Sequence, residues 1–527
     1  MIKTRITLKL NYTQDDIYTA ITESLPVERS ELREVRIIKR TLEVSDKSNI
    51  HYTATVAVSL SAEREAGLLK MKKKVAKMED LSLSLPPCTF SSRPLVVGAG
   101  PAGLFAALLL AEAGAAPILI DRGLSVSERE KKVGLFTSLG ILDPECNIQF
   151  GEGGAGSFSD GKLKVGSIDK YKYKILSDMV DAGAPEDIIY SVGAHVGTDK
   201  LKNIVQKIRQ KIIYLGGEVR FSTKLTSLKI SVGKVVGAIC DSMGDSIEID
   251  TDTIILATGH SARDTFAMLR GAGVPMEARG FGIGLRIEHP REYINRLVYG
   301  ENAPDGLGAA SYHLVTHLPT GRSVYSFCMC PGGTVVAAAS EQGGIVTNGM
   351  SEYARDGVNS NAAFLVSVTP ADFGSDDPLA GIELQRKIER AAYSVTGGNY
   401  RAPATSLGAF INGEAPKISS VKPSYPIGVE CIDPECYLPH YVTESIRAAI
   451  PDFDAWLSGF YLPDAAMTGA ETRTTSPVRI LRDENYEVVG IKGLYPIGEG
   501  AGYAGGIVSS ARDGLIVAES IVHRNLK

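Results

Sequence analysis

The stretch Leu95-Val-Val-Gly98-Ala-Gly100-Pro-Ala-Gly103 decides the fold of this chain. A short apolar strand runs into three glycines spaced as G-x-G-x-x-G, and an Ala/Leu-rich helix begins at Pro101. Gly98 permits a tight turn, Gly100 lets the backbone approach a pyrophosphate, and Gly103 lets helix and strand pack closely. The helix start offers free N–H groups and the positive end of its dipole to phosphates. The stretch therefore predicts a dinucleotide-phosphate site.

A second buried strand over 117–120 ends at Asp121. An acid at this place, roughly 20 residues beyond the glycines, is part of the dinucleotide-binding pattern. Asp121 can accept hydrogen bonds from an adenosine ribose, which favours an unphosphorylated 2′-hydroxyl. An antiparallel meander over 225–249 and a buried strand over 253–257 follow. The fold class predicted is α/β, a Rossmann-like domain of three ββα layers.

Composition divides the chain into a small N-terminal unit, a linker and a domain with a long insertion. Alternating apolar residues from Ile2 onward and a helix start at Thr13 indicate a small α+β, ferredoxin-like unit. The expected ranges are 1–85 for this unit, 86–93 for a Pro/Ser-rich linker, 94–262 and 486–527 for the two parts of the dinucleotide-binding domain, and 263–485 for an inserted, mostly β, α+β substrate or cap domain.

The net charge of the chain does not favour binding to nucleic acid or to an anionic membrane. The 527 residues contain 56 Lys+Arg and 61 Asp+Glu, a formal net charge of −5. The basic run Lys70, Lys72, Lys73, Lys74 and Lys77 is interpreted as a solvated helix face, because no aromatic residues interleave it. Nucleic acid is therefore not an expected partner.

Cysteine content and hydropathy indicate a reducing, cytoplasmic setting. Seven cysteines are too few, and odd in number, for a disulfide framework. The N-terminus, MIKTRITLKLNY, lacks the apolar core of a signal peptide. The most apolar stretch, 95–120, contains Glu112 and coincides with the dinucleotide motif, so we do not interpret it as a transmembrane helix.

Three blocks resemble the FAD-binding blocks of two-dinucleotide-fold flavoproteins of the glutathione-reductase type. The first is VVGAGPAGLFAALLLAEAG…ILIDRG, the second is the strand ending in Ala257-Thr258-Gly259, and the third is Gly493–Gly506. The resemblance implies FAD as cofactor, with Glu499 at the position whose acid binds the ribityl chain. That position normally carries Asp after Gly, so Gly498-Glu499 is a departure. The helix from Ile507 is expected to point its positive dipole end at the flavin.

Longer segments resemble the bacterial FAD-dependent dehydrogenase family. They are Asn147-Ile-Gln-Phe-Gly-Glu-Gly-Gly-Ala-Gly156-Ser-Phe-Ser-Asp-Gly-Lys-Leu163, Phe327-Cys-Met-Cys-Pro-Gly-Gly333, Thr347-Asn-Gly-Met350 and Glu471-Thr-Arg-Thr-Thr-Ser-Pro-Val-Arg479. With the N-terminal unit they cover nearly the whole chain. The family's name implies a flavin redox enzyme and no particular substrate.

The cofactor is expected to contact the G-x-G-x-x-G fingerprint at residues 98–103, the Gly-rich loop 151–161 and the two later blocks. The loop could wrap the flavin or its phosphates through backbone N–H groups, or be a structural Ω-loop. Two arginines after the second strand could reach the adenine or ribityl-phosphate end, or lie on the surface. The expected cofactor-binding residues are Gly98, Gly100, Pro101, Ala102, Gly103, Asp121, Arg122, Arg129, Gly154, Gly156, Ser157, Thr258, Gly259, Gly498, Glu499, Gly500, Gly505, Gly506 and Ile507.

Three residues are candidates for catalysis. Arg473 could bind a substrate carboxylate or a flavin edge as a planar fork, or be a buried arginine paired with Glu471 or Asp483. His260, directly after the second block, could act as an acid or base, or be a second-layer or surface histidine. Cys330 could be a thiol near the substrate or a core residue. No metal site is expected.

The sequence favours a flavoenzyme of the dehydrogenase or reductase class, with a flavin monooxygenase as the alternative within that class. No second G-x-G-x-x-G has a βαβ context, so NAD(P)H is expected at most as a transient electron donor. A small-molecule substrate is expected, and an anionic one is an option. A flavin-bearing RNA-modification or RNA-binding protein is a second hypothesis, because the Gly-rich loop resembles flavin-dependent tRNA modifiers. A sensor that keeps FAD structurally is the third. Oligomeric state is not predicted.

Overall fold

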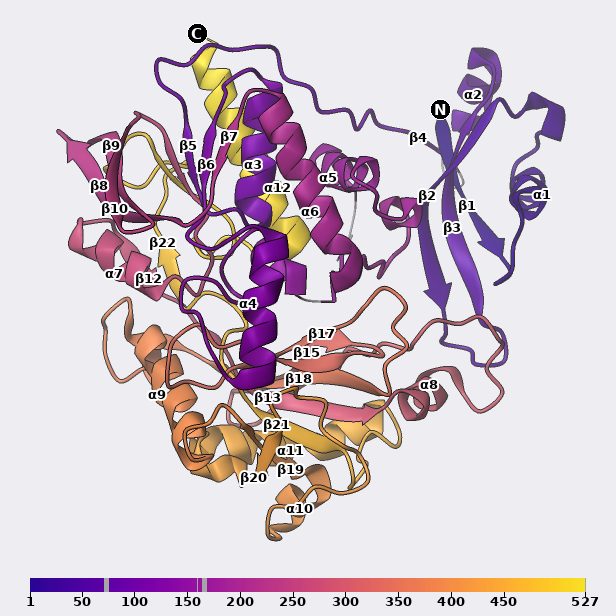
Figure 1. The fold of residues 1–527 in the computed structure, drawn as a ribbon. Helices are drawn as coiled ribbons and strands as arrows, with labels where there is room; N and C mark the ends of the chain where they lie inside the picture. Colours follow the sequence, from indigo (N-terminus) through magenta and orange to yellow (C-terminus); the bar gives the residue numbers. More distant parts are fainter. Residues whose placement is uncertain (71–74, 159, 164–167, 527) are drawn as a thin grey trace.

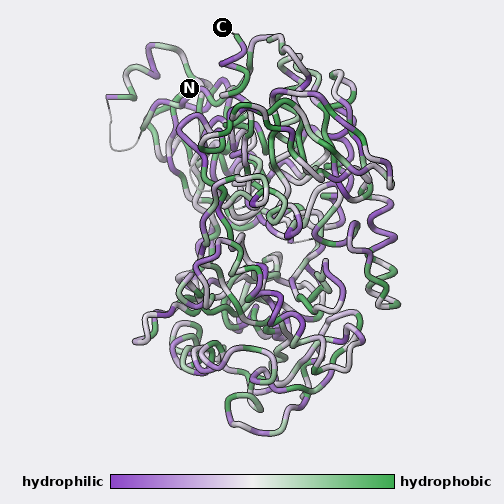
Figure 2. Tube along the Cα trace, turned by 90° about the vertical axis from the view of Figure 1, so that its left-hand side faces the viewer, coloured by the Kyte–Doolittle hydropathy of each residue, from purple (hydrophilic) through white to green (hydrophobic). Residues whose placement is uncertain are grey.

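The computed structural model describes residues 1–70, 75–158, 160–163 and 168–526. Figure 1 shows a parallel-sheet lobe above, a lobe built on a seven-stranded sheet below, and a small N-terminal unit beside both. Turned by 90°, the two lobes lie one above the other and narrow where they meet (Figure 2). Lys72, Lys73 and Lys74 of the basic run and Ser159 of the Gly-rich loop lie outside the described residues.

The parallel-sheet lobe has the three layers predicted for a dinucleotide-binding domain. Its central sheet has the order β23-β11-β5-β6-β7, with all neighbours parallel. The strands are β5 (Leu95–Val97), β6 (Ile118–Ile120), β7 (Glu218–Arg220), β11 (Ile254–Leu256) and β23 (Leu494–Pro496). One face carries α3 (Pro101–Glu112), α6 (Thr198–Tyr214) and α12 (Ile507–Asn525), and the other carries the meander β8 (Thr223–Ser231), β9 (Lys234–Ser242) and β10 (Asp245–Asp250) (Figure 1).

Alternation along the strands explains why these short segments are wholly apolar. In β5, Val96 joins the core under the helices, whereas Leu95 and Val97 join the core under the meander. Leu119 and Ile255 repeat the first pattern in the neighbouring strands. Both faces of the sheet are therefore buried, so a strand here needs a continuous apolar run.

The second lobe is built on a mostly antiparallel sheet of order β14-β15-β18-β13-β21-β19-β20. Its strands are β14 (Val315–His317), β15 (Ser323–Cys330), β18 (Asn359–Val368), β13 (Phe281–Pro290), β21 (Ala466–Glu471), β19 (Ala402–Ser406) and β20 (Val429–Cys431). The helices α8 (Arg291–Tyr299), α9 (Ala380–Val395) and α11 (His440–Trp456) pack around a buried cluster that includes Phe364, Phe410, Phe453 and Phe460. This β-rich lobe lies within the range 263–485, over which the sequence predicts a mostly β, α+β domain.

The edges of that region pack on the parallel-sheet lobe instead. Phe266 and Leu269 of α7 (Arg263–Gly271) share a core with Leu95. So does Val478 of β22 (Val478–Ile480), which pairs with β12 (Met276–Ala278). We therefore propose that the chain passes from the parallel-sheet lobe into the second lobe near Gly280 and returns near Thr474. The predicted boundaries were 262/263 and 485/486.

The N-terminal unit has the element order β-α-β-β-α-β of the ferredoxin-like motif. It comprises β1 (Ile2–Leu8), α1 (Gln14–Ser24), β2 (Glu34–Glu43), β3 (His51–Ser59), α2 (Ala62–Leu69) and β4 (Ala76–Lys77), in the antiparallel order β2-β3-β1-β4. Its attachment centres on Arg40, whose guanidinium donates to Ser191 Oγ at 2.7 Å and whose backbone pairs with residues 190 and 192. Lys47 reaches the other lobe, donating to the carbonyl of Leu297 at 3.0 Å.

Among the described residues, no helix combines the length and the apolar character that crossing a membrane requires. All seven cysteines lie in the described part of the chain, and none of them forms a disulfide there.

The packing of α3 on β5 gives a first prediction. A Cβ at Gly103 would lie 1.8 Å from the Gly98 carbonyl oxygen, so Gly103→Ala must push the helix off the strand. We expect a loss of about 2–4 kcal/mol of unfolding free energy, within the range for overpacked or strained core positions, measured by denaturant unfolding.

The matched control is Gly134→Ala in α4 (Val126–Leu139), where an added Cβ meets nothing within 4 Å. Helix propensity should make this change stabilising by about 0.5–1 kcal/mol. Equal stability of the two variants would contradict the packing argument.

Candidate functional site

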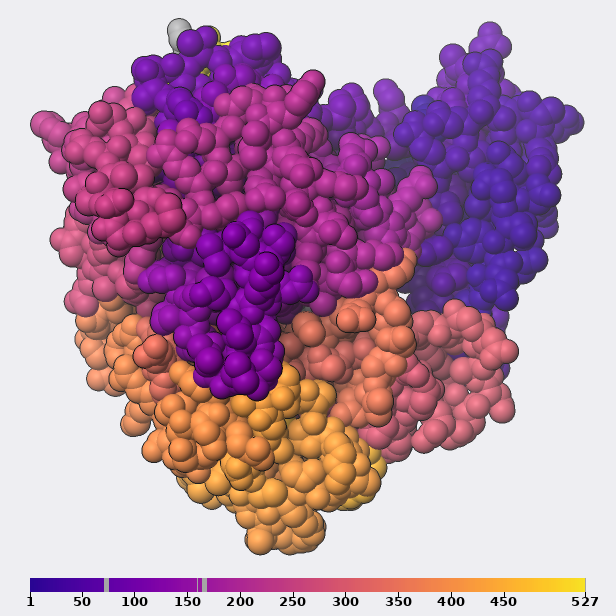
Figure 3. All heavy atoms as spheres, viewed as in Figure 1, coloured from indigo at the N-terminus to yellow at the C-terminus, as the bar shows by residue number. Residues whose placement is uncertain are grey.

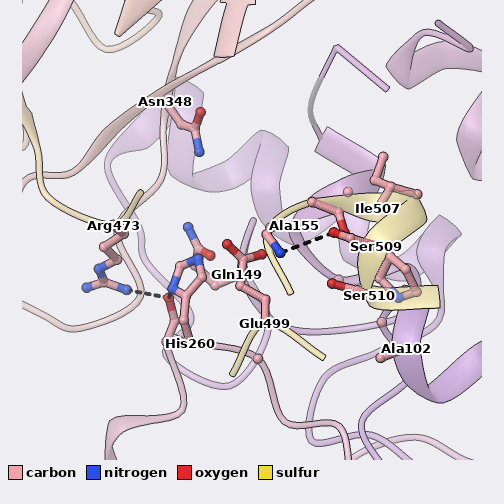
Figure 4. Close-up of a pocket in the computed structure, with 18 of the residues that line it drawn as sticks. Ala102, Gln149, Ala155, His260, Asn348, Arg473, Glu499, Ile507, Ser509 and Ser510 are labelled. Carbon is pink, nitrogen blue, oxygen red and sulfur yellow. Dashed lines mark hydrogen bonds between the residues drawn. The ribbon is translucent and has the colours of Figure 1, made fainter. Parts of the chain in front are cut away.

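A cavity of about 950 Å³ lies between the lobes and takes its lining from both. Its volume is near the top of the range of roughly 300–1,000 Å³ for ligand pockets. The parallel-sheet lobe contributes Gly98, Gly100, Pro101, Ala102, Asp121, Arg122, Gly154, Gly156, Thr258, Gly259, His260, Glu499, Gly505, Gly506 and Ile507. The second lobe and the segment joining them contribute Cys330, Asn348, Glu471 and Arg473, among others. Figure 4 shows His260, Gln149, Arg473 and Glu499 gathered around one space, with the start of α12 beside it.

The three fingerprint glycines have three different jobs. Gly98 has φ +107°, and a Cβ there would lie 2.4 Å from the Ala257 carbonyl oxygen. Gly103 is buried against Gly98 and does not line the cavity. At Gly100, the N-cap of α3, a Cβ would meet only the Cα of Gly154 at 3.9 Å. Gly100 is thus the fingerprint glycine whose missing side chain leaves room for a ligand at the helix start.

Asp121 fixes the backbone of this turn. Its two carboxylate oxygens accept the amides of Ala99 at 2.7 Å and Gly123 at 2.8 Å. Burial raises the pKa of Asp121, and the two amide hydrogen bonds lower it again in part. Each oxygen keeps a lone pair, so the side chain can still accept from a ribose hydroxyl at the cavity edge.

The Gly-rich loop packs directly on the fingerprint. The amide of Gly153 donates to the Ala99 carbonyl at 2.8 Å, and Gly154 and Gly156 line the cavity. Ser157 does not line it; the Ser157 carbonyl accepts from Thr198 Oγ1 at 2.6 Å and ties the loop to α6. The loop therefore has a cavity-facing glycine side and a buried anchoring side.

The expectation that Arg129 reaches the cofactor needs correction. Arg129 is fully buried, is not part of the cavity lining, and donates to the carbonyls of Asn147 at 2.7 Å, Ile148 at 2.5 Å and Glu152 at 2.7 Å. Burial lowers the pKa of this guanidinium to about 10. Its five N–H donors in a fixed fork suit several carbonyls of one loop at once. Arg129 therefore fixes the backbone conformation at the start of the Gly-rich loop from the buried side.

Arg122 does line the cavity, but its guanidinium is already paired. It forms a two-pronged pair with Asp264 at 2.8 and 2.9 Å and donates to Glu145 at 2.6 Å. Its flat face lies 4.4 Å from the centre of the Phe150 ring. The Arg122 guanidinium therefore borders the cavity, but its charge is balanced by Asp264 and Glu145.

The third block places a helix start at the cavity. Gly506 caps α12, and Gly505, Gly506 and Ile507 all line the space. Gly498 and Gly500 do not; Gly498 donates to Asp513 at 2.7 Å, and a Cβ at Gly500 would lie 2.4 Å from the Gly259 carbonyl oxygen. These two glycines shape the turn around Glu499 without lining the cavity themselves.

Glu499 faces the cavity from this turn. Burial raises its pKa to about 7, against a hydrogen bond from the Gly506 backbone that lowers it. A carboxyl titrating near neutrality beside a cavity is well suited to hydrogen bonds with ligand hydroxyls.

A large flat group fits the lining. A Cβ built at Gly259, Gly505 or Gly506 would meet nothing within 4 Å, so these stretches of backbone border open space. Together with the bare helix starts of α3 and α12, this leaves room and donors for both phosphates and a ring system. The residues present thus fit a dinucleotide such as FAD.

Arg473 lines the cavity, but its charge is engaged inside the protein. Glu389 of α9 accepts from Arg473 at 3.0 and 2.9 Å and from Arg263 at 2.9 and 2.8 Å. Arg473 also donates to Ser261 at 3.2 Å and is hydrogen-bonded to Ser340. The two guanidinium groups hold the pKa of Glu389 well below its usual range. Neither Glu471 nor Asp483 is its partner, and the substrate-carboxylate role expected for Arg473 loses support.

His260 stands next to this cluster. Burial and the positive charges of Arg473 and Arg263 lower the pKa of His260 to about 3. Its imidazole is therefore neutral at physiological pH and lies within hydrogen-bond distance of Ser261, at 3.1 Å. His260 can orient a ligand by hydrogen bonds through its neutral ring, but it is not the imidazolium that a general acid requires.

Cys330 lies in the lining and is almost fully buried. Burial raises the pKa of its thiol to about 12, and the thiol donates to the Cys328 carbonyl at 3.2 Å. It is a thiol rather than a thiolate, which argues against a nucleophile. Cys328, with φ +38°, is the exposed member of the pair, where the register of β15 with β18 shifts.

Two lining residues had no role in the sequence analysis. Lys162 directly follows the Gly-rich loop, and Asn348 lies in β17 (Thr347–Met350). Both fall inside the quoted family segments, which was the available signal. The sequence could not show that they line one cavity, because they belong to segments far apart in the chain, one in each lobe.

Comparisons with known proteins relate this chain to FAD-dependent proteins. Residues 92–137 match the model of an FAD binding domain, and residues 280–474 match the model described as FAD-dependent protein, C-terminal domain-like. An uncharacterized protein of Clostridium beijerinckii is 43% identical over 526 residues, covering 98% of each chain. The chain belongs to this family of FAD-dependent proteins. Its cofactor is FAD.

Solved structures show more distant likeness. A 3-ketosteroid-Δ4-(5α)-dehydrogenase of Rhodococcus jostii is 13% identical, with TM-score 0.34, covering 84% of this chain and all of that one. The E. coli quinol fumarate reductase subunit FrdA is 15% identical, with TM-score 0.35, covering 83% of this chain and 70% of that one. At these values the likeness carries no argument about function.

Gly100 gives a test of the phosphate site. Gly100→Glu should place charge and bulk where the pyrophosphate approaches, so the purified protein should be colourless with its far-UV circular dichroism unchanged. Gly100→Ala, whose Cβ has room, is the control and should keep the fold and a larger share of the FAD. Flavin absorbance per protein measures both, and a fully yellow Gly100→Glu variant would refute the assignment.

Glu499 gives a pH prediction for the FAD-free protein. Its pKa is raised from 4.5 to about 7, so its stabilising contribution is complete below pH 4.5 and is lost as pH rises through 7. Glu499→Gln should therefore gain stability relative to the native chain between pH 5 and pH 8, by on the order of 1–3 kcal/mol.

Thermal unfolding at the two pH values measures this difference. Glu484→Gln, an exposed residue on a turn, is the control and should show no such gain. A Glu499→Gln difference that is constant with pH would mean that Glu499 is not held protonated by burial.

Proposed function

We propose that this protein is an FAD-dependent oxidoreductase of the dehydrogenase or reductase class, which moves a hydride or electrons between a small organic substrate and the flavin. The observation that carries the proposal is one cavity with two kinds of wall. One wall is glycine backbone and helix starts from the parallel-sheet lobe, and the other is a polar surface from the second lobe. A cofactor held on the first wall would present its reactive ring to a substrate held on the second.

Bound FAD supplies the redox chemistry, accepting or giving a hydride at its ring. The residues of the chain bind and orient. The start of α3, Gly100 and the Gly-rich loop would hold the phosphates, Asp121 the ribose, and Glu499 the ribityl hydroxyls. The start of α12 would face the ring with its positive dipole end, which favours a reduced, negatively charged ring.

The second wall, with His260 of the parallel-sheet lobe beside it, would exclude water and place the substrate. His260, neutral and within reach of Ser261, would give or accept a hydrogen bond without exchanging a proton. The buried set Arg263, Glu389 and Arg473 would keep it neutral, since protonating it beside two guanidinium groups is unfavourable. Arg263 also forms an ion pair with Glu341 at 2.6 Å, so the two guanidinium groups contact two carboxylates, Glu389 and Glu341.

NAD(P)H is proposed as a transient electron donor that docks at the flavin, and a cytoplasmic setting is proposed from the cysteine content. No observation in the described residues favours the monooxygenase or RNA-modification alternatives over the dehydrogenase.

The test is an anaerobic titration of the purified yellow protein with NADH and then NADPH, following the visible flavin band. Bleaching by one nucleotide, several times faster than by the other, is expected of a pyridine-nucleotide-linked reductase. Bleaching by organic substrates alone would identify a dehydrogenase with a different electron acceptor. A flavin that only dithionite reduces would contradict the proposed function and favour a structural role for FAD.

A further inference from the structure

One wall of the cavity, formed where residues 160–162 contact the second lobe, is rich in hydrogen-bond donors. Lys162 and Asn348 both line it, and Figure 4 draws Asn348 with its amide nitrogen turned toward the other lining residues. The question is which chemical group these donors fit.

Lys162 brings a cation that the protein does not neutralise. Its Nζ donates to the Met329 carbonyl at 2.5 Å, which uses one of three N–H donors of an ammonium group. In the part of the chain that the structure describes, no carboxylate forms an ion pair with it. Burial and the nearby Arg355 charge lower the pKa of Lys162, with Asp160 acting in the opposite sense.

Asn348 is oriented by a residue that can only donate. Its Oδ1 accepts from the Arg286 guanidinium at 2.8 Å and from the Gly349 amide at 2.8 Å. An arginine has no acceptor, so the oxygen of Asn348 must face Arg286 and its NH₂ group must face away. Two further N–H donors are thereby directed away from the Arg286 network.

The acids of this wall are already compensated. Glu471 is held by Arg286 at 2.5 and 2.9 Å, and Asp160 by Arg355 at 2.6 and 3.1 Å. Arg473 is balanced by Glu389, as described above. Lys162 is therefore the uncompensated cation of the wall among its described lysines and arginines.

Two adjacent residues of strand β15, Cys328 and Met329, link the two donors. Lys162 binds the Met329 carbonyl, and Arg286, which orients Asn348, donates to the adjacent Cys328 carbonyl at 2.8 Å. The hydroxyl of Tyr312, another lining residue, is buried and has no hydrogen-bond partner among the described residues. Together these groups present one cation and several neutral hydrogen-bond donors. The carboxylates beside them, Glu471 and Asp160, are already paired with arginines.

We propose that Lys162 and Asn348 form the substrate-binding subsite of this oxidoreductase, and that its substrate is a small organic acid held by its carboxylate. A carboxylate has two oxygens that accept hydrogen bonds, and charge-assisted bonds to it are strong. The inference rests on the proposed function and replaces Arg473 by Lys162 as the anion anchor.

The test reads binding without turnover. The FAD-bound protein is titrated with acetate, succinate and benzoate, and separately with acetamide, succinamide and benzamide as uncharged counterparts. At least one acid should perturb the flavin absorbance or fluorescence with saturation, and its amide should not.

Variants assign the binding to the subsite. Lys162→Met should retain FAD and weaken the acid by about 10-fold or more, while Lys162→Arg, which keeps the charge, should lose less. Asn348→Asp, which replaces two donors with an acceptor, should weaken it to a similar degree. The control is Lys224→Met, because Lys224 lines the same cavity but is paired with Asp264 at 2.6 Å and Glu145 at 3.1 Å.

Three results would overturn the inference: no acid perturbs the flavin, Lys162→Met binds the acid as the native chain does, or Lys162→Met and Lys224→Met weaken it equally. A changed flavin spectrum without acid, at unchanged acid affinity, would show that Lys162 contacts the cofactor instead. Lys162-dependent acid binding to a flavin that only dithionite reduces would leave the subsite standing and refute the proposed function.

Discussion

The structure depends on a close approach of two backbones at the end of β5. The carbonyl of Gly98 lies where a side chain at residue 103 would begin, at 1.8 Å from the position of its Cβ. This contact seats the first turn of α3 on the sheet and brings its free amides to the edge where the parallel strands end. Asp121 then fixes the turn through the Ala99 and Gly123 amides. The Gly-rich loop is laid over it through the Ala99 carbonyl.

A second constraint joins the lobes. Glu389 of α9 in the second lobe is shared by Arg263 of α7, which packs on the parallel-sheet lobe, and by Arg473, which follows β21. In Figure 3, α4 also lies across the boundary of the lobes, and its Phe136 packs edge-on against Tyr400, with ring centres 5.1 Å apart. A buried carboxylate hydrogen-bonded to two guanidinium groups and the Thr472 hydroxyl tolerates little displacement of any partner. The cavity between the lobes is therefore defined by fixed charges as well as by shape.

The sequence was most informative where chemistry is local in the chain. The spacing of Gly98, Gly100 and Gly103, with Asp121 after the next strand, predicts a βαβ unit and its phosphate edge, because all four residues lie within one short stretch of chain, 95–121. Sequence reasoning could not separate glycines that face a ligand from those that only pack, such as Gly103 and Gly500. It also could not show that Arg129 is buried or that Arg473 has Glu389 as partner, since the two partners lie on elements that are distant in the chain. Such pairings depend on how the second lobe folds back, which no local pattern encodes.

The attachment of the N-terminal unit has a mechanical consequence. Arg40 joins it to residues 190–192 of the parallel-sheet lobe, directly beside the cavity-lining Val192 and Gly193, and Lys47 joins it to Leu297 of the second lobe. A body fastened to both sides of a cleft works as a cross-brace, and it limits how far the two sides can hinge apart. The separation of the two lobes beside Val192 and Gly193 thus depends on these two fastenings as well as on the contacts between the lobes themselves.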